Sequence, residues 1–243
     1  MESTAFSKPL KSLSVVIPAY NERNRILVTL RKLRTYLDAH ASEYEVLVVD
    51  DGSKDDTSTV VAGEISGWSN ARLITLSKNV GKGGAVRAGV LAATKENLCF
   101  MDADCSTDLE MFPRMFALLN AQTSVIIGSR DVKGAEVVVH QNFLREYSAK
   151  FFNLWIQAWL LPGVWDTQCG FKMFRTDVAR KIFEPLIEQR FAFDVEILYR
   201  ARKLGCSIVE CPVRWSNVAD SRVSPLRDGI AMAWQVVKIR FMA

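Results

Sequence analysis

The chain has 243 residues, of which 49% are hydrophobic and 24% are charged, and its formal net charge is +4. This composition describes a globular protein with room for one large α/β domain. No Pro/Gly/Ser-rich linker, internal repeat or low-complexity segment divides the sequence. The basic residues form no long stripe interleaved with aromatic residues, which argues against nucleic acid as a partner and favours anionic substrates or lipid headgroups.

A strand-forming run and a helical pattern alternate from the start of the chain. Residues 13–18 form a short β-rich run, and residues 23–37 carry apolar side chains at helical spacing. The alternation recurs in strand and helix ranges 44–49 and 55–65, 73–76 and 84–93, and 98–101 and 109–119, followed by a strand over 124–128. This order predicts an α/β fold with a doubly wound, mostly parallel sheet, and we expect a single domain over residues 13–243 after a tail of residues 1–12.

The first three predicted strands each end in a polar loop, at the edge where doubly wound sheets bind ligands. Tyr20 and Glu22 follow the first strand and are suited to stacking on a base and holding a ring N–H, while Asp50 can accept hydrogen bonds from a base or ribose. The third loop is rich in glycine, which allows close backbone approach to a ligand, and Lys82 adds a positive charge. A plain turn or a helix N-cap explains each loop separately, so the residues alone leave both readings open.

The fourth predicted strand ends in two carboxylates one residue apart, Asp102 and Asp104. Side chains at positions i and i+2 of an extended segment point to the same side, and two hard oxygen ligands suit Mg²⁺ or Mn²⁺ bridging a diphosphate. The pair therefore predicts a nucleotide-activated substrate, although acidic residues also occur at strand ends in solvated turns.

The cysteines and the apolar segments indicate in which compartment the protein works and whether it contacts a membrane. The five cysteines include no Cys-x-x-Cys pair and the chain has two histidines, which disfavours a zinc site and predicts reduced thiols in a cytoplasm. Residues 1–11 lack the apolar centre of a signal peptide, and no stretch reaches the ~20 apolar residues of a membrane span. The aromatic-rich segment 151–161 predicts an interfacial helix, with a core helix or a dimer interface as alternatives. In the interfacial case, membrane contact by this helix is expected to be assisted by Trp234, Lys238, Arg240 and Phe241.

The four loops together resemble the family 2 inverting glycosyltransferases of GT-A fold, through residues 16–22, 49–53, 79–87 and 102–104. Residues 128–130, 166–174 and 192–198 resemble the dolichyl-phosphate (polyprenyl-phosphate) β-glucosyltransferases, and dolichyl-phosphate mannose synthases share much of the pattern. The resemblance implies a Rossmann-like GT-A fold with a nucleotide-binding part over about residues 13–104, an acceptor-binding part over about 105–225 and a C-terminal, interfacial helix over 226–243.

The resemblance also implies an activity: transfer of a hexose, with glucose from UDP-glucose favoured, to the phosphate of a polyprenyl lipid with Mg²⁺ or Mn²⁺ as cofactor. GDP-mannose as donor, or a hydroxyl acceptor, are the alternatives. Such an enzyme would work peripherally at the cytoplasmic face of a membrane, and the sequence leaves a homo-oligomer open.

Individual roles follow from the resemblance, position by position. Asp102 and Asp104 would hold the metal and, with Arg130, form the catalytic set. The nucleotide would be held by Pro18, Tyr20, Glu22, Asp50, Asp51, Lys82, Gly83, Asp102 and Ala103. The lipid phosphate would be bound by Arg130, Arg145, Ser148, Ser221 and Arg222, and the sugar by Asp166, Gln168, Asp194 and Glu196. Arg145 on a solvated helix face, and Asp194 and Glu196 stabilising the start of a helix, are the structural alternatives.

A phosphate acceptor determines the expected mechanism. A phosphomonoester is ionised near neutral pH, with a second pKa of about 6, and needs no protein base. The enzyme would place its oxygen in line behind the sugar C1 and stabilise the departing diphosphate through cations. A single displacement inverts the anomeric centre.

Overall fold

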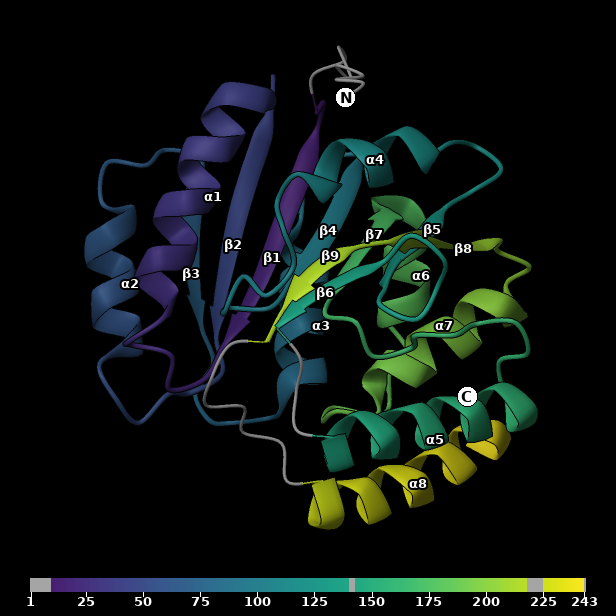
Figure 1. Cartoon of the computed structure of the whole chain (residues 1–243). Coiled ribbons are helices and arrows are strands. Elements are labelled where there is room, and N and C mark those ends of the chain that lie inside the picture. Colours follow the sequence, from purple (N-terminus) through teal and green to yellow (C-terminus); the bar gives the residue numbers. More distant parts are fainter. Residues whose placement is uncertain (1–9, 140–142, 218–224, 243) are drawn as a thin grey trace.

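Strands and helices alternate through the first half of the chain, as the computed structural model in Figure 1 shows; it describes residues 10–139, 143–217 and 225–242. The elements are β1 (Leu13–Ala19), α1 (Ile26–His40), β2 (Tyr44–Asp50), α2 (Thr57–Ile65), β3 (Ala71–Thr75), α3 (Lys82–Ala92), β4 (Asn97–Met101), α4 (Met111–Leu118), β5 (Val125–Ser129), β6 (Glu136–Val139), α5 (Phe143–Trp159), β7 (Phe171–Arg175), α6 (Thr176–Phe183), α7 (Phe193–Lys203), β8 (Ile208–Pro212), β9 (Arg214–Ser216) and α8 (Pro225–Met242).

The central sheet has seven strands in the order β3-β2-β1-β4-β7-β5-β8. Every pairing is parallel except those of β7, which runs antiparallel to both β4 and β5. The register sets Leu13 opposite Tyr44 and Ala19 opposite Asp50, so β1 and β2 end together. The prediction of a mostly parallel, doubly wound sheet is confirmed, and the loops after β1, β2 and β4 meet at one edge.

Helices cover both faces of this sheet because its strands are apolar on both sides. Val15 and Ile17 of β1 face one core with α1, α2 and α4, whereas Val16 faces a second core with α3, α5, α6, α7 and α8. This alternation is the period of two expected of an extended chain. The expected helix starts are shifted by two or three residues in several places: α1 begins at Ile26, not at residue 23, after a turn in which the carbonyl of Glu22 accepts from Ile26 N–H at 3.0 Å.

A second, two-stranded parallel sheet of β6 and β9 crosses in front of the main sheet (Figure 1) and was not anticipated from the sequence. It is tied to the loop after β4: Ser216 N–H donates to the carbonyl of Ser106 at 2.9 Å, and Asp108 N–H donates to the carbonyl of Arg214 at 3.0 Å. β9 therefore carries Trp215 to the carboxyl end of β4.

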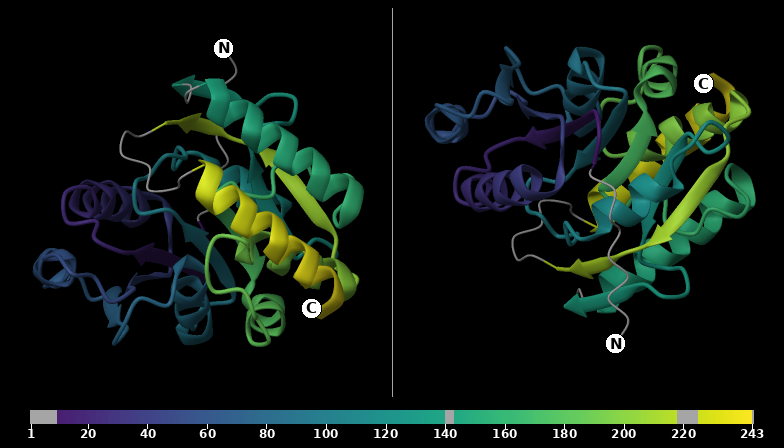
Figure 2. Two further views of the ribbon diagram at one scale, coloured as in Figure 1. Left: turned by 90° about the horizontal axis from the view of Figure 1, so that it is seen from below. Right: turned by 90° about the horizontal axis from the view of Figure 1, so that it is seen from above.

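The helices α5 and α8 lie side by side beneath the sheet (Figures 1 and 2). Ile156 of α5 and Val236 and Ile239 of α8 are buried in one core, and the Arg240 guanidinium lies 5.9 Å from the ring centroid of Trp159. Within the described ranges, neither these helices nor any other is long and apolar enough to cross a bilayer.

Candidate active site

The loops after β1 and β2 are bound to each other where the two strands end. Asn21 N–H donates to Ser53 Oγ at 2.8 Å, and the Asn21 side chain accepts from Lys54 N–H at 2.7 Å. Asn21 has φ +52°, a left-handed conformation that asparagine tolerates better than most residues. Pro18 and Tyr20 are half-buried at this edge, and the Glu22 carboxylate accepts from Arg25 Nε and Nη2 at 2.8 and 2.7 Å.

Asp50 and Asp51 are 2% exposed, and their carboxylates have protein partners. Asp50 accepts from both the N–H and the hydroxyl of Ser53, while Asp51 accepts from Val80 N–H at 2.8 Å and Gly81 N–H at 2.9 Å. Burial raises the pKa of Asp51, against the effect of those two backbone bonds. Both carboxylates fix the loops of this edge, and their contact with a nucleotide stays a prediction.

The glycines of the third loop approach the protein's own chain. A Cβ at Gly83 would overlap the Phe193 side chain, and Gly84 N–H donates to the carbonyl of Gln189 at 3.0 Å. The close approach that was expected for a ligand is thus made, at Gly83, by Glu188 and by Phe193 at the start of α7. This packing fixes the first turn of α3 and the Lys82 side chain that projects from it.

Asp102 and Asp104 follow the end of β4. A Cβ at Gly170 would overlap the Asp102 carboxylate, which occupies the space that this glycine leaves open. Lys82 Nζ lies 2.6 Å from Asp102 Oδ1, and Asp104 Oδ1 accepts from Ser106 N–H at 3.0 Å and from the Ser106 hydroxyl. Burial opposes the charge of Lys82, but Asp102 and Asp194 raise its pKa well above the usual range.

The two carboxylates fit a divalent metal. They supply hard oxygen ligands, and the cradle at Gly170 is shaped to receive the Asp102 carboxylate. No cluster of three His, Cys, Asp or Glu that could hold an ion occurs among the described residues. The remaining ligands would be diphosphate oxygens and water, which is the mode of binding that Mg²⁺ favours.

Arg130 lies at the end of β5 in a bidentate ion pair. Its Nε and Nη2 donate to Asp166 at 2.7 and 2.9 Å, and its backbone N–H donates to the same carboxylate at 3.0 Å. Asp166 is fully buried; burial would raise its pKa, but Arg130 lowers it below the usual range. The structure does not support the expected sugar contact of Asp166, because its oxygens hold Arg130 and the N–H groups of Gln168 and Cys169.

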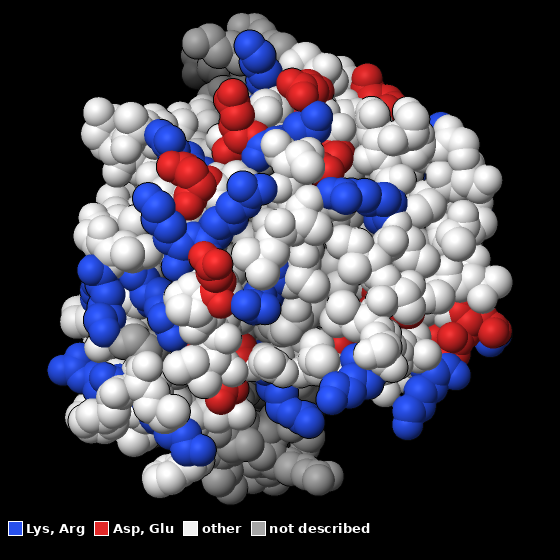
Figure 3. Space-filling view, turned by 180° about the vertical axis from the view of Figure 1, so that it is seen from behind, with Lys and Arg blue, Asp and Glu red and all other residues white. Residues whose placement is uncertain are grey.

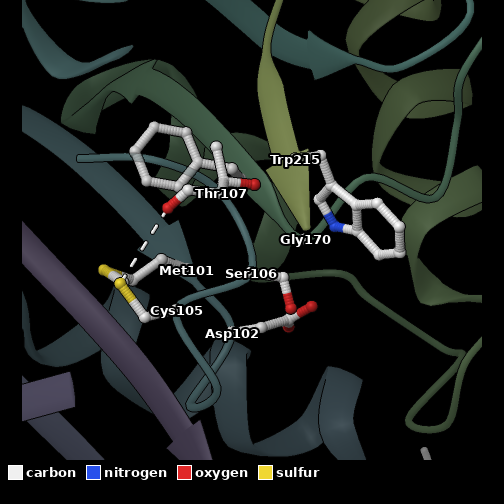
Figure 4. Close-up of a pocket in the computed structure, with 8 residues that line it drawn as sticks. Met101, Asp102, Cys105, Ser106, Thr107, Gly170 and Trp215 are labelled. Atoms are coloured by element: carbon white, nitrogen blue, oxygen red, sulfur yellow. Dashed lines mark hydrogen bonds between the residues drawn. The ribbon is translucent and has the colours of Figure 1, made fainter. Parts of the chain in front are cut away.

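A small pocket lies beside the Asp102 carboxylate and is bordered by Trp215, the ring near the Arg130 guanidinium. It is lined by Asp102, Ser106, Thr107, Gly170 and Trp215, with Met101, Cys105 and Phe171 (Figure 4). The Arg130 guanidinium lies 5.3 Å from the ring centroid of Trp215. The pocket therefore has a carboxylate that could bind a metal on one wall and, behind its indole wall, a fixed guanidinium.

A family model described as Glycosyl transferase family 2 matches residues 14–183. The chain belongs to this family. It is 37% identical over 241 residues to a dolichyl-phosphate beta-glucosyltransferase of Dictyostelium discoideum, an alignment covering 94% of this chain and 74% of the relative. It is 35% identical over 248 residues to the human protein of the same name, covering 97% of this chain and 76% of the relative.

Solved structures confirm the GT-A-like fold of this family 2 glycosyltransferase. Glucosyl-3-phosphoglycerate synthase of Mycobacterium tuberculosis, crystallised with Mn²⁺, UDP and phosphoglyceric acid, superposes with a TM-score of 0.67 at 19% identity. The match covers 94% of this chain and 77% of the other. At that identity the likeness establishes the fold.

Lys172 is a buried charged residue to which the sequence analysis assigned no role. It is fully buried, its Nζ pairs with Asp194 and donates to the carbonyl of Cys169 at 2.8 Å, and it lies 5.3 Å from the ring centroid of Phe100. Burial raises the pKa of Asp194, against the opposing effects of Lys172 and Lys82. Asp194 is thus the partner of a buried lysine, and its contact with a sugar stays a prediction.

Glu196, which was expected to contact the sugar, is fully buried. Its carboxylate accepts from Ile187 N–H at 3.0 Å, Glu188 N–H at 2.6 Å and Arg200 Nε at 2.7 Å. These bonds leave it no surface from which to contact a sugar, so that expectation is not supported. Glu196 instead fixes the segment that packs on the first turn of α3.

The remaining site residues are placed as follows. Ala103 is buried, and its carbonyl accepts from Thr29 Oγ1 at 2.7 Å; Gln168 is half-buried. Arg145 and Ser148 lie on α5, of which only the backbone is described at those positions. Ser221 and Arg222 lie outside the described residues.

Replacing Glu196 with alanine is expected to lower the free energy of unfolding by roughly 3 kcal/mol, because it leaves buried N–H groups and Arg200 without their acceptor. Urea unfolding measures the loss. Glu184→Ala, at an exposed position just after α6, is the matched control and should change stability by no more than about 0.5 kcal/mol. Equal values for the two variants would contradict the assigned role.

Proposed function

We propose that this chain transfers glucose from UDP-glucose to the phosphate of a dolichyl-type polyprenyl lipid, with inversion at the sugar C1 and with Mg²⁺ or Mn²⁺ bound. The observation that carries the proposal is the 35–37% identity, over more than nine-tenths of this chain, to relatives named dolichyl-phosphate beta-glucosyltransferase. A phosphate acceptor needs no protein base, and the lining of the pocket is consistent with such an acceptor. Among its described lining residues Asp102 is the one acid, and it is already paired with Lys82.

In the proposed mechanism Asp102 and Asp104 would hold the metal, which would supply positive charge for the departing diphosphate. Lys82 contributes a second cation on the same side. Arg130 is held rigidly by Asp166 beside Trp215, and it orients the acceptor phosphate and reduces the repulsion between two anions. The acceptor oxygen is already ionised at neutral pH, so no side chain has to remove a proton.

A transfer assay tests the proposal directly. Radiolabelled UDP-glucose, GDP-mannose and UDP-GlcNAc are offered separately to a short polyprenyl phosphate in detergent with Mn²⁺ or Mg²⁺. The expected result is a glucosyl lipid from UDP-glucose. A lipid product formed only from another donor would overturn the choice of sugar, and donor hydrolysis without any lipid product would overturn the acceptor.

The lipid acceptor requires contact with a membrane, and we propose that α5 and α8 provide it. Their exposed apolar side chains include Phe151 (75% exposed), Trp234 (63%) and Phe241 (77%). Lys238 lies over the Trp234 ring at 5.7 Å. Basic side chains also gather on the left and lower edges of the back face, on the side of these helices (Figure 3). Aromatic anchors beside cations are typical of interfacial helices on anionic membranes. The free thiols of all five cysteines suit the cytoplasmic face.

The double variant Trp234→Ala/Phe241→Ala should bind vesicles containing anionic phospholipid roughly 10-fold more weakly than the wild type, because it removes two apolar anchors. Co-sedimentation with such vesicles measures the change. The control is Val28→Ala, which removes an exposed apolar side chain from α1 on another part of the molecule. Unchanged vesicle binding by the double variant would exclude this face as the anchor.

A further inference from the structure

Lys82 is paired with one of the two carboxylates to which we assign the metal. Its Nζ lies 2.6 Å from Asp102 Oδ1. The two side chains are 21% and 36% exposed, so a ligand entering the site meets this ion pair at the surface. An ammonium and a divalent cation cannot share one carboxylate oxygen at contact distance without strong repulsion.

The position of Lys82 is fixed by the fold. Lys82 is the first residue of α3, whose first turn packs through Gly83 against Glu188 and against Phe193 at the start of α7. The Lys82 ammonium also lies 5.9 Å from the ring centroid of Phe193. A lysine side chain is protonated at physiological pH even at its ordinary pKa. A metal therefore meets a protonated, positioned lysine and not a mobile surface chain.

Lys82 also has other anionic partners available. Asp194 is 4% exposed and paired with the buried Lys172, and its charge raises the pKa of Lys82. An ammonium that leaves Asp102 thus stays in a favourable field. A diphosphate entering beside Asp102 would offer it a stronger partner than the carboxylate it gives up, since it carries more charge.

We propose that Lys82 makes metal binding and donor binding depend on each other: without nucleotide it competes with the divalent metal for Asp102, and the donor diphosphate frees Asp102 by taking Lys82 as its own cation. This inference rests on the proposed function in one respect, the use of a nucleoside diphosphate donor with a metal. Coupling of this kind is reciprocal, so the factor by which nucleotide tightens metal binding equals the factor by which metal tightens nucleotide binding.

The test is a titration of the protein with Mn²⁺, followed by the EPR signal of the free ion, in the absence and presence of UDP or GDP. Lys82→Met should bind Mn²⁺ about 5-fold more tightly than the wild type without nucleotide, since it removes a half-exposed ion pair. Nucleotide should tighten Mn²⁺ binding less in the variant than in the wild type. Equal or weaker Mn²⁺ binding by Lys82→Met without nucleotide would overturn the proposal.

Two further variants separate competition from a general change in charge. Lys78→Met removes an exposed lysine from the same loop and should leave Mn²⁺ affinity as in the wild type; a gain equal to that of Lys82→Met would overturn the proposal. Lys82→Gln, a second neutral variant, should repeat the tighter binding if Lys82→Met folds poorly. Neither the acceptor nor the sugar enters this titration. Absence of lipid product together with the expected Mn²⁺ shift would overturn the proposed acceptor and leave this inference standing.

Discussion

Arg130→Met is expected to destabilise the protein by roughly 3 kcal/mol and to abolish transfer to the lipid phosphate. The stability loss follows from Asp166, which is fully buried and loses both side-chain donors of its ion pair. The loss depends on pH in a defined direction. Arg130 lowers the pKa of Asp166 in the folded protein below its usual value of 3.8, so the stabilisation is complete above that pH and is lost as the pH falls through the folded pKa. The difference in unfolding free energy between wild type and variant should therefore be largest near neutral pH and shrink in acid.

The double variant Arg130→Met/Asp166→Asn distinguishes a structural arginine from one that binds the acceptor. It removes the buried charge together with its partner, so most of the lost stability should return. Transfer should not return, because the acceptor phosphate still lacks its cation. Urea unfolding and kcat/KM for the lipid phosphate are measured on the same preparations. Recovery of kcat/KM along with stability would mean that Arg130 serves the fold and does not bind the acceptor.

The parallel strands β1 to β4 were predictable because each is a short apolar run followed by a helical pattern, whereas β8 was not predicted. The antiparallel strand β7 was not predicted either, since its sequence places Lys172 between Phe171 and Met173 and a lysine normally indicates a solvent-facing position. The charge of Lys172 is neutralised by Asp194, which lies 22 residues later in the chain. A pairing over that distance is visible only in the folded structure. The three residues of β9 are likewise too few to show a periodicity.

Contacts between residues far apart in the chain are not visible in the sequence, and this also affects the prediction of site residues. Asp102 and Asp104 were predicted as metal ligands because both follow the end of a strand, a local property that the sequence shows. Asp166 and Glu196 were expected to contact a sugar from their motifs, yet each is fully buried against an arginine and backbone N–H groups. A sequence does not distinguish an acidic residue whose partner is a ligand from one whose partner is a side chain far away in the chain. The role of Gly170, which leaves space for the Asp102 carboxylate, becomes visible only when the position of Asp102 is known.

Asp104→Asn is expected to lower kcat at least ~10²-fold while leaving thermal unfolding unchanged. Asp104 is half-buried, and its Oδ1 accepts from Ser106 N–H, a bond that the asparagine oxygen can still accept. The fold should therefore tolerate the change, whereas the anionic oxygen to which we assign the metal is lost. Mn²⁺ binding, followed by the EPR signal of the free ion, should weaken in parallel with turnover.

The control for this variant is Asp108→Asn, which makes the same change four residues later in a carboxylate that lies 3.6 Å from Arg214 and outside the pocket. It should keep Mn²⁺ affinity and turnover near wild-type values. If Asp104→Asn retained wild-type turnover, Asp104 would not be a metal ligand. If Asp104→Asn and Asp108→Asn lost turnover equally with Mn²⁺ affinity intact, the loop after β4 would matter for its conformation, because both residues form hydrogen bonds with backbone N–H groups of that loop. Loss of both Mn²⁺ affinity and turnover in Asp104→Asn alone is the result that the metal assignment requires.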